Sequence, residues 1–337
     1  MAACHFFRGQ NPTICGHRCW GLVIPLSCKC AKFSAREYKK GGIAMNILQI
    51  EHLQKDYGKE PKVVHALNDV TFSVGTGVFG LLGHNGAGKT TLMKLIATIS
   101  KPTSGNISVC GFDTQSQGDE VRQLIGYLPQ ELNMYPSLTV RDFVSYMGEL
   151  KGIKSKQKVM EVLEQVDMTQ FASRKISQLS GGMKRRVGIA QALIGDPRIL
   201  IVDEPTAGLD PEERVRFRGV LSRFAKDGRC VLLSTHIVED VYQLCERLAV
   251  LRKGTLFFCG SPDELLSHVA GKVKLVELAS EMDLIALQKK TVVLSTTYEH
   301  NKIQARIMDE AGRFSEPAVP ETLEDAYVYC MGGKSYE

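Results

Sequence analysis

The chain has 337 residues, which is enough for about two domains with a buried core. Apolar residues make up 44% and charged residues 23% of the sequence, so its composition excludes disorder, collagen and coiled coils. No apolar run reaches the roughly 18 residues that a membrane-spanning helix needs. We therefore expect any role at a membrane to come through a partner.

The net charge of +5 is concentrated at the beginning of the chain. Residues 1–44 contain seven Lys and Arg and one Glu, so the rest of the chain has 35 basic and 36 acidic residues. Affinity for nucleic acid comes from clustered Lys and Arg, and this nearly neutral body predicts none. The cysteines after residue 44 are scattered, which is typical of a reduced, cytoplasmic protein.

Residues 1–44 have no helical or strand periodicity, whereas an alternating strand pattern begins abruptly at Met45 and covers residues 46–50. The codons of Lys40-Gly41-Gly42 can contain a ribosome-binding sequence of bacterial type, and this sequence would lie just before the Met45 codon. We therefore expect residues 1–44 to be a non-native or disordered leader that takes no part in the fold. An intact mass that includes these residues, measured on protein from its own locus, would contradict this expectation.

Two alternatives for this leader are weaker. A signal or transit peptide is disfavoured because its apolar stretch is short. A zinc site is disfavoured because the spacing of the candidate ligands does not fit the usual C-x2-C pairs. Those candidates are Cys15, His17, Cys19, Cys28 and Cys30.

A glycine-rich loop lies between an apolar stretch, residues 78–82, and a helical run, residues 92–96. The loop matches GxxxxGK[ST], in which backbone N–H groups surround phosphate oxygens and the helix N-terminus adds its positive dipole end. We expect Lys89 to reach the β- and γ-phosphates of a nucleotide and the Thr90 hydroxyl to bind Mg²⁺. The predicted nucleotide-binding residues here are Gly83, His84, Asn85, Gly86, Ala87, Gly88, Lys89, Thr90 and Thr91.

A second apolar strand, residues 199–202, ends in the carboxylates Asp203 and Glu204. Ligands of open α/β sheets lie beyond the carboxyl ends of strands, so we expect Asp203 to hold Mg²⁺ and Glu204 to polarise the attacking water. A strand that ends in Asp-Glu could by itself merely cap the next loop. Its combination with the phosphate loop favours ATP hydrolysis.

The segment Leu179-Ser180-Gly181-Gly182-Met183 lies between these two halves, and the order of motifs over residues 46–268 resembles that of the ATP-binding cassette (ABC) ATPases. The resemblance implies an α/β P-loop fold, with a mixed RecA-like sheet, an antiparallel β subdomain and a helical subdomain at about residues 131–178. It places this cassette domain at residues 45–268. The other matching residues and their implied roles are Tyr57, which stacks on adenine; Gln130, which contacts the metal and the membrane partner; Asp210 in Gly208-Leu209-Asp210, which binds nucleotide; and His236, which senses the γ-phosphate. The catalytic set becomes Glu204, His236, Gln130 and Lys89.

Ser180, Gly181 and Gly182 open a predicted helix whose free N–H groups form an anion site. The same molecule already holds phosphate at Lys89, so the resemblance implies that this second site binds the ATP of a partner subunit. Two head-to-tail cassettes, a homodimer in the simplest case, then enclose two ATP molecules. Hydrolysis weakens the closed dimer by removing contacts with the γ-phosphate.

The chain departs from the usual pattern at Met183, where Gln is the commonest residue, and at His84, where Pro is frequent. Residues 183–186 resemble the bacterial cassettes of the multidrug, antibiotic-resistance and lantibiotic-immunity type. These carry a C-terminal extension, which we expect at residues 269–337. Two strands, residues 273–278 and 291–297, and a final helix, residues 321–327, are predicted there, and a packing or dimer-supporting role is favoured over a regulatory ligand site.

We therefore expect a cytoplasmic ATPase that is peripheral on the inner face of the cell membrane and drives a separately encoded permease. The subgroup resemblance favours export over import. The main alternative is a non-transport ABC ATPase with soluble partners, but the split cassettes of DNA-repair relatives and the double cassettes of translation-factor relatives are absent from this sequence. A binding module without turnover is disfavoured by the complete set Lys89, Asp203, Glu204 and His236.

Overall fold

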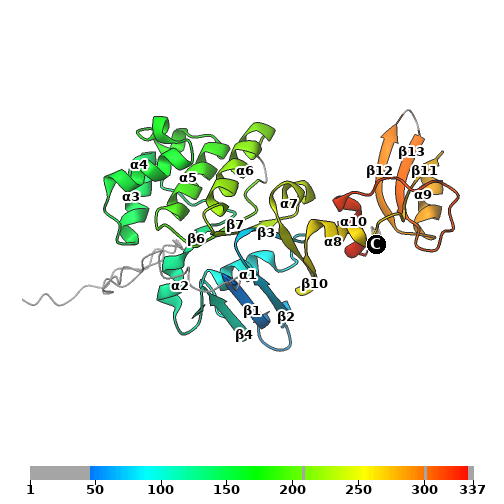
Figure 1. Ribbon diagram of the computed structural model, residues 1–337, viewed down its shortest axis with the longest axis horizontal. Coiled ribbons are helices and arrows are strands. Elements are labelled where there is room, and N and C mark those ends of the chain that lie inside the picture. The colour runs from blue at the N-terminus through cyan, green and yellow to red at the C-terminus, as the bar shows by residue number, and fades with distance from the viewer. Residues whose placement is uncertain (1–45, 207–208, 300–301, 333–337) are drawn as a thin grey trace, which may run out of the picture. The chain divides into compact units, whose positions relative to one another are not determined.

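The computed structural model describes residues 46–206, 209–299 and 302–332, which form three sheets and the helices around them (Figure 1). The expected leader and Gly208 lie outside the described residues. No described helix is both long enough and apolar enough to cross a bilayer.

The first sheet is antiparallel, with the strand order β2-β1-β4-β5. Its strands are β1 (Leu48–Tyr57), β2 (Val64–Val74), β4 (Ser104–Val109) and β5 (Phe112–Asp113). Leu48, Ile50 and Leu53 of β1 are buried among exposed neighbours because successive side chains of a strand point to opposite faces. This sheet is the antiparallel subdomain that the sequence predicts.

The central sheet has the order β10-β9-β3-β8-β7-β6. Neighbouring strands are parallel apart from β10, which pairs antiparallel with β9. The strands are β3 (Gly77–Leu82), β6 (Ile125–Leu128), β7 (Ile199–Asp203), β8 (Cys230–Thr235), β9 (Arg247–Arg252) and β10 (Thr255–Gly260). Every residue of β7 and β8 is buried, as expected for parallel strands covered on both faces.

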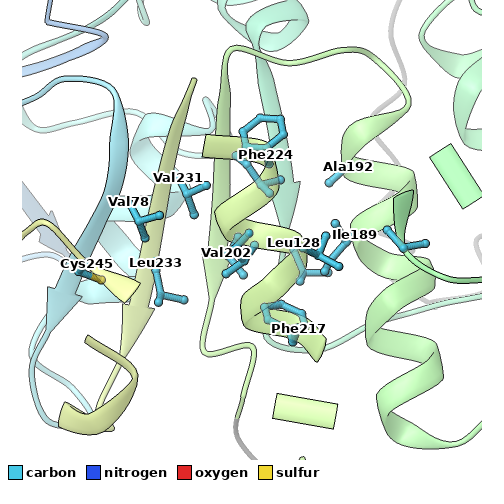
Figure 2. Close-up of a cluster of buried hydrophobic side chains, with 14 of the residues drawn as sticks. Val78, Leu128, Ile189, Ala192, Val202, Phe217, Phe224, Val231, Leu233 and Cys245 are labelled. Atoms are coloured by element: carbon cyan, nitrogen blue, oxygen red, sulfur yellow. The ribbon is translucent and has the colours of Figure 1, made fainter. Parts of the chain in front are cut away.

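Two hydrophobic cores flank this sheet. Figure 2 shows one of them, in which Val202, Val231 and Leu233 of the strands face Phe217 and Phe224. Alternate strand residues, such as Ile201 and Leu232, join the other core together with the first helix. The helices around the sheet are α1 (Lys89–Ile96), α2 (Gly118–Leu124), α5 (Gly181–Leu193), α6 (Pro211–Ala225), α7 (Val238–Leu244) and α8 (Pro262–Ser267).

The helical subdomain follows β6. Within the helical subdomain expected at about residues 131–178, the structure has two α-helices, α3 (Val140–Leu150) and α4 (Lys156–Gln165), and a short 3-10 turn, Thr169–Phe171. The break has a local cause. Gly152 has a φ of 78°, which a helix cannot accommodate, and the Ser155 hydroxyl accepts a hydrogen bond from the backbone N–H of Lys158 and so begins α4.

The C-terminal extension is a three-stranded antiparallel sheet in the order β11-β13-β12, with one helix against each face. Its elements are β11 (Val273–Leu278), α9 (Glu281–Gln288), β12 (Val293–Glu299), β13 (Lys302–Met308) and α10 (Leu323–Cys330). The first predicted strand coincides with β11, and the second begins two residues too early. Helix α9 and strand β13 are not predicted from the sequence, and the predicted final helix begins two residues before α10.

Candidate functional site

The phosphate loop joins β3 to α1 and depends on glycine at two positions. Gly86 and Gly88 have φ angles of 82° and 104°, a region that side chains rarely adopt. A Cβ atom at Gly88 would also lie only 2.6 Å from the carbonyl oxygen of Ala66. His84, Asn85 and Gly86 are exposed on this loop, while Thr90 and Thr91 are half-buried in the first turn of α1.

Lys89 is almost fully buried and turns back over the loop that precedes it. Its ammonium donates hydrogen bonds to the carbonyl oxygens of Gly83 at 2.6 Å and His84 at 3.2 Å. The same Nζ atom lies 3.1 Å from Oε1 of Glu204. A lysine on one element and a carboxylate 115 positions later on the chain thus meet at the carboxyl ends of β3 and β7.

Glu204 follows β7 directly and links Lys89 to His236. Its second oxygen, Oε2, lies 2.8 Å from Nδ1 of His236, and its backbone N–H donates to the Ser234 carbonyl oxygen at 3.1 Å. The φ angle of Glu204 is 45°, an uncommon value for a residue other than glycine, and such values cluster at functional sites. The structure therefore brings Lys89, Glu204 and His236 into one chain of charge-assisted contacts.

Asp203 lies beside this chain and is fully buried. Its Oδ1 atom accepts a hydrogen bond from the Ser234 hydroxyl at 2.5 Å, while its Oδ2 atom has no hydrogen-bond partner among the described residues. Buried carboxylate oxygens are normally paired, so an oxygen left unpaired by the protein is one that a cation can use.

The charge of Asp203 acts on its surroundings. Burial raises the pKa of Tyr127, and the Asp203 carboxylate raises it further. Burial lowers the pKa of Arg185, and the same carboxylate partly offsets that change.

Ser234 and the pair Thr206–Asp240 are part of the site, and sequence reasoning missed them. The Thr206 hydroxyl donates to Oδ2 of Asp240 at 2.5 Å, which ties the loop after Glu204 to α7, the helix that follows His236. Ser234 lies opposite Asp203 in the parallel pairing of β7 and β8. Knowing that these two strands are neighbours would have been sufficient to assign Ser234.

Four other predicted positions lie apart from this chain of contacts. Tyr57 at the end of β1 is 42% exposed, with the Lys55 ammonium 4.9 Å from the centre of its ring, and Gln130 is exposed after β6. Ser180 caps α5 by accepting from the N–H of Met183, and Asp210 caps α6 by accepting from the N–H of Glu213. Within the described ranges, no hydrogen bond or ion pair joins these four residues to Lys89 or Glu204.

Ser180, Gly181 and Gly182 form the start of α5, as the sequence predicts. Gly181 is exposed, and a Cβ atom there would meet nothing within 4 Å, so the helix N-terminus is open on that side. Gly182 is buried, and a Cβ atom there would lie 2.8 Å from the Glu213 side chain. An open helix N-terminus of this kind can bind an anion.

Comparison with known proteins identifies the family. Residues 67–207 match the family described as ABC transporter. The linearmycin resistance ATP-binding protein LnrL of Bacillus subtilis (strain 168) is 33% identical over 288 residues, which cover 83% of this chain and 90% of that protein. Nod factor export ATP-binding protein I of Burkholderia pseudomallei (strain 1710b) is 39% identical over 310 residues, which cover 86% of this chain and 98% of that protein. The chain belongs to the ABC transporter ATP-binding proteins.

Solved structures agree with this assignment. A bacterial ABC transporter cassette solved as a dimer is 26% identical, with a TM-score of 0.58, and the match covers 64% of this chain and 98% of that one. A dimeric cassette in a post-hydrolysis state with bound ADP and Pi is also 26% identical, with a TM-score of 0.57 and the same coverage. The cassette described here therefore has the fold of an ABC ATPase, and it binds and hydrolyses ATP, as the resemblance implies.

Proposed function

We propose that this cassette is the motor subunit of an export system and drives a separately encoded integral-membrane permease from the inner face of the cell membrane. The observation that carries the proposal is the chain of contacts from Lys89 through Glu204 to His236 at the carboxyl ends of the central strands. Export is supported by relatives whose names specify resistance to linearmycin and export of Nod factor.

Each residue of the site has a task in this proposal. The phosphate loop and Lys89 bind the β- and γ-phosphates, Tyr57 stacks on the adenine and Asp210 contributes to the nucleotide site. Glu204 accepts a proton from the attacking water. His236 holds the Glu204 carboxylate in place and contacts the γ-phosphate.

The metal part of the site fits Mg²⁺. Asp203 offers its unpaired Oδ2 atom, and the Thr90 hydroxyl and the Gln130 amide supply further oxygen ligands, which is the donor set that Mg²⁺ prefers. The ion supplies positive charge that neutralises the phosphate oxygens during transfer.

A second copy of the cassette completes the site in this proposal. In it, the open N-terminus of α5, with Ser180, Gly181 and Gly182, binds the ATP that the other copy holds at its Lys89. The dimer closes on ATP and opens after hydrolysis. The sites then act in pairs, and we propose a homodimer.

Replacing Ser234 by Ala tests the metal site. Loss of the hydroxyl leaves Oδ1 of Asp203 without its buried donor and frees the carboxylate to turn, so we expect the Mg²⁺ concentration for half-maximal ATPase activity to rise about tenfold, as is typical when a residue that orients a metal ligand is removed. ATP binding without Mg²⁺ should not change. Ser234→Thr keeps a hydroxyl and should restore most of the metal affinity, whereas equal Mg²⁺ dependence in Ser234→Ala and the parent would contradict the assignment.

The permease is tested by copurification. Glu204→Gln protein with a C-terminal tag is isolated with ATP from host membranes in mild detergent, in parallel with Glu239→Gln, in which the altered residue is an exposed glutamate of α7. We expect a polytopic membrane protein in stoichiometric amount with the Glu204 variant. Recovery of soluble partners alone would overturn the transport proposal and assign the ATPase to another process.

A further inference from the structure

The sheet of the C-terminal extension is covered only in part on the face where α9 lies. Leu287 of α9 packs with Val276 of β11 and with Ala305 and Ile307 of β13. Strand β12 lies at the edge of this sheet, and its Val293, Thr296 and Tyr298 side chains line an open groove together with Leu284 and Ile285 of α9. The groove has a volume of about 310 Å³. The groove therefore runs between α9 and the edge strand of the sheet, and it is open to an incoming side chain.

The outer side of α9, an orange helix in Figure 1, is apolar as well. Met282 is 80% exposed and Ile285 54% exposed, and Ala286 beside them is also exposed. Ile285 and Ala286 lie three and four positions after Met282, so the three residues form one stripe on the helix surface, opposite the buried Leu287. A helix that is apolar on both sides is normally enclosed by protein.

The two ends of α9 carry opposite charges. Glu281 and Asp283 are in its first turn, and Lys289 and Lys290 follow its last residue. None of these four takes part in an ion pair within the part of the chain that the structure describes. Glu281 and Lys289 each lie four positions from Ile285, on opposite sides of it. Two such helices placed antiparallel about a two-fold axis at Ile285 would therefore set each Glu281 against the partner subunit's Lys289.

We propose that the stripe of Met282, Ile285 and Ala286, together with the groove beside it, docks the α9 helix of a second copy of this chain in antiparallel orientation. Each helix then covers the open part of the other copy's sheet above β12 and buries its own outer stripe. The proposal rests on the proposed function in that a cassette dimer needs two copies. It adds a contact that does not depend on nucleotide and that keeps the two copies paired after the ATP-dependent interface opens.

A cysteine at the centre of the stripe tests this geometry in the full chain without nucleotide. Under mild oxidation, Ile285→Cys should give a disulfide-linked dimer at least about tenfold more abundant than the parent or the matched control Glu324→Cys, an exposed position on α10. A cysteine close to a two-fold axis meets its own copy, whereas one remote from the interface does not. Dimer formation equal to that of the control would overturn the proposal.

Reversing the charges at the two ends of α9 gives an independent test. A variant that only weakens the fold would not be rescued by the second reversal, so the double variant separates the two effects. Glu281→Lys and Lys289→Glu should each raise the dissociation constant of the nucleotide-free dimer about tenfold in analytical ultracentrifugation, because each creates two like-charge contacts. The double variant carries both reversals in one chain and should restore the parent value. A double variant whose dimer dissociates more readily than that of either single variant would overturn the antiparallel pairing.

The outcomes separate this inference from the proposed function. An ATP-dependent dimer of Glu204→Gln that persists while Ile285→Cys fails to crosslink would remove the α9 contact and leave the motor proposal intact. A crosslink from Ile285→Cys to the permease alone, or binding to anionic lipid vesicles that Ile285→Glu abolishes with no change in oligomeric state, would overturn the second copy as the occupant.

Discussion

Replacing Glu204 by Gln should reduce the kcat of ATP hydrolysis by about 10²–10⁴-fold while ATP still binds. The amide has the shape of the carboxylate and can still accept a hydrogen bond from Lys89, but it cannot take a proton from water. Steady-state phosphate release and equilibrium binding of ATP measure the two effects separately. With ATP retained, the variant should also elute as a dimer in size-exclusion chromatography.

Glu239→Gln is the matched control for this variant. Glu239 is exposed on α7, three residues after His236, and its only side-chain hydrogen bond among the described residues is with Gln243. Its kcat should equal that of the parent. An undiminished rate in Glu204→Gln would show that another group accepts the proton.

Replacing Lys89 by Met should lower the affinity for ATP by at least about 100-fold and destabilise the fold by about 3 kcal/mol. The first effect follows from the loss of the ammonium that binds phosphate. The second follows because Glu204, only 7% exposed, loses the cation that lies 3.1 Å from it. Methionine keeps the apolar length of the lysine chain, so packing changes little.

The double variant Lys89→Met/Glu204→Gln separates these two effects. Removing the carboxylate along with the ammonium leaves neither member of this pair as an unpaired buried charge, so urea unfolding without nucleotide should show that most of the lost stability is recovered. ATP affinity should remain low. A double variant as unstable as Lys89→Met alone would mean that the Lys89–Glu204 contact does not account for the loss.

The phosphate loop and the acidic strand end could be located because their patterns are local in the sequence, whereas His236 and Gln130 were predicted only through the family resemblance. A phosphate loop needs glycines at fixed spacing before a helix, and the apolar strand that ends in two acids gained its meaning from the presence of that loop. The contact between Lys89 and Glu204 could be anticipated only because parallel strands place their carboxyl ends at one edge of a sheet. Ser234 was missed because its role depends on which strands are neighbours, and the spacing along the chain does not encode that.

The extension was harder to predict. The pattern of α9 has apolar residues on both sides, so it lacks the periodicity that reveals a surface helix. The break between α3 and α4 depends on the backbone angle of Gly152 and on the cap at Ser155. The alternation of polar and apolar residues continues on both sides of these two positions, so it does not reveal the break. The elements of the extension that depend on tertiary packing were therefore mislocated or missed, and the local signals of the break between α3 and α4 were missed as well.

The most direct test of the central claim, that Glu204 and His236 act as one catalytic unit, is the single-turnover rate of ATP hydrolysis in three variants. These are Glu204→Gln, His236→Ala and the double variant, each saturated with ATP. Residues that act together lose most of their effect with the first substitution, so the account predicts a double variant no slower than the slower single variant. Rate losses that multiply would show that the two side chains act independently and would contradict the account.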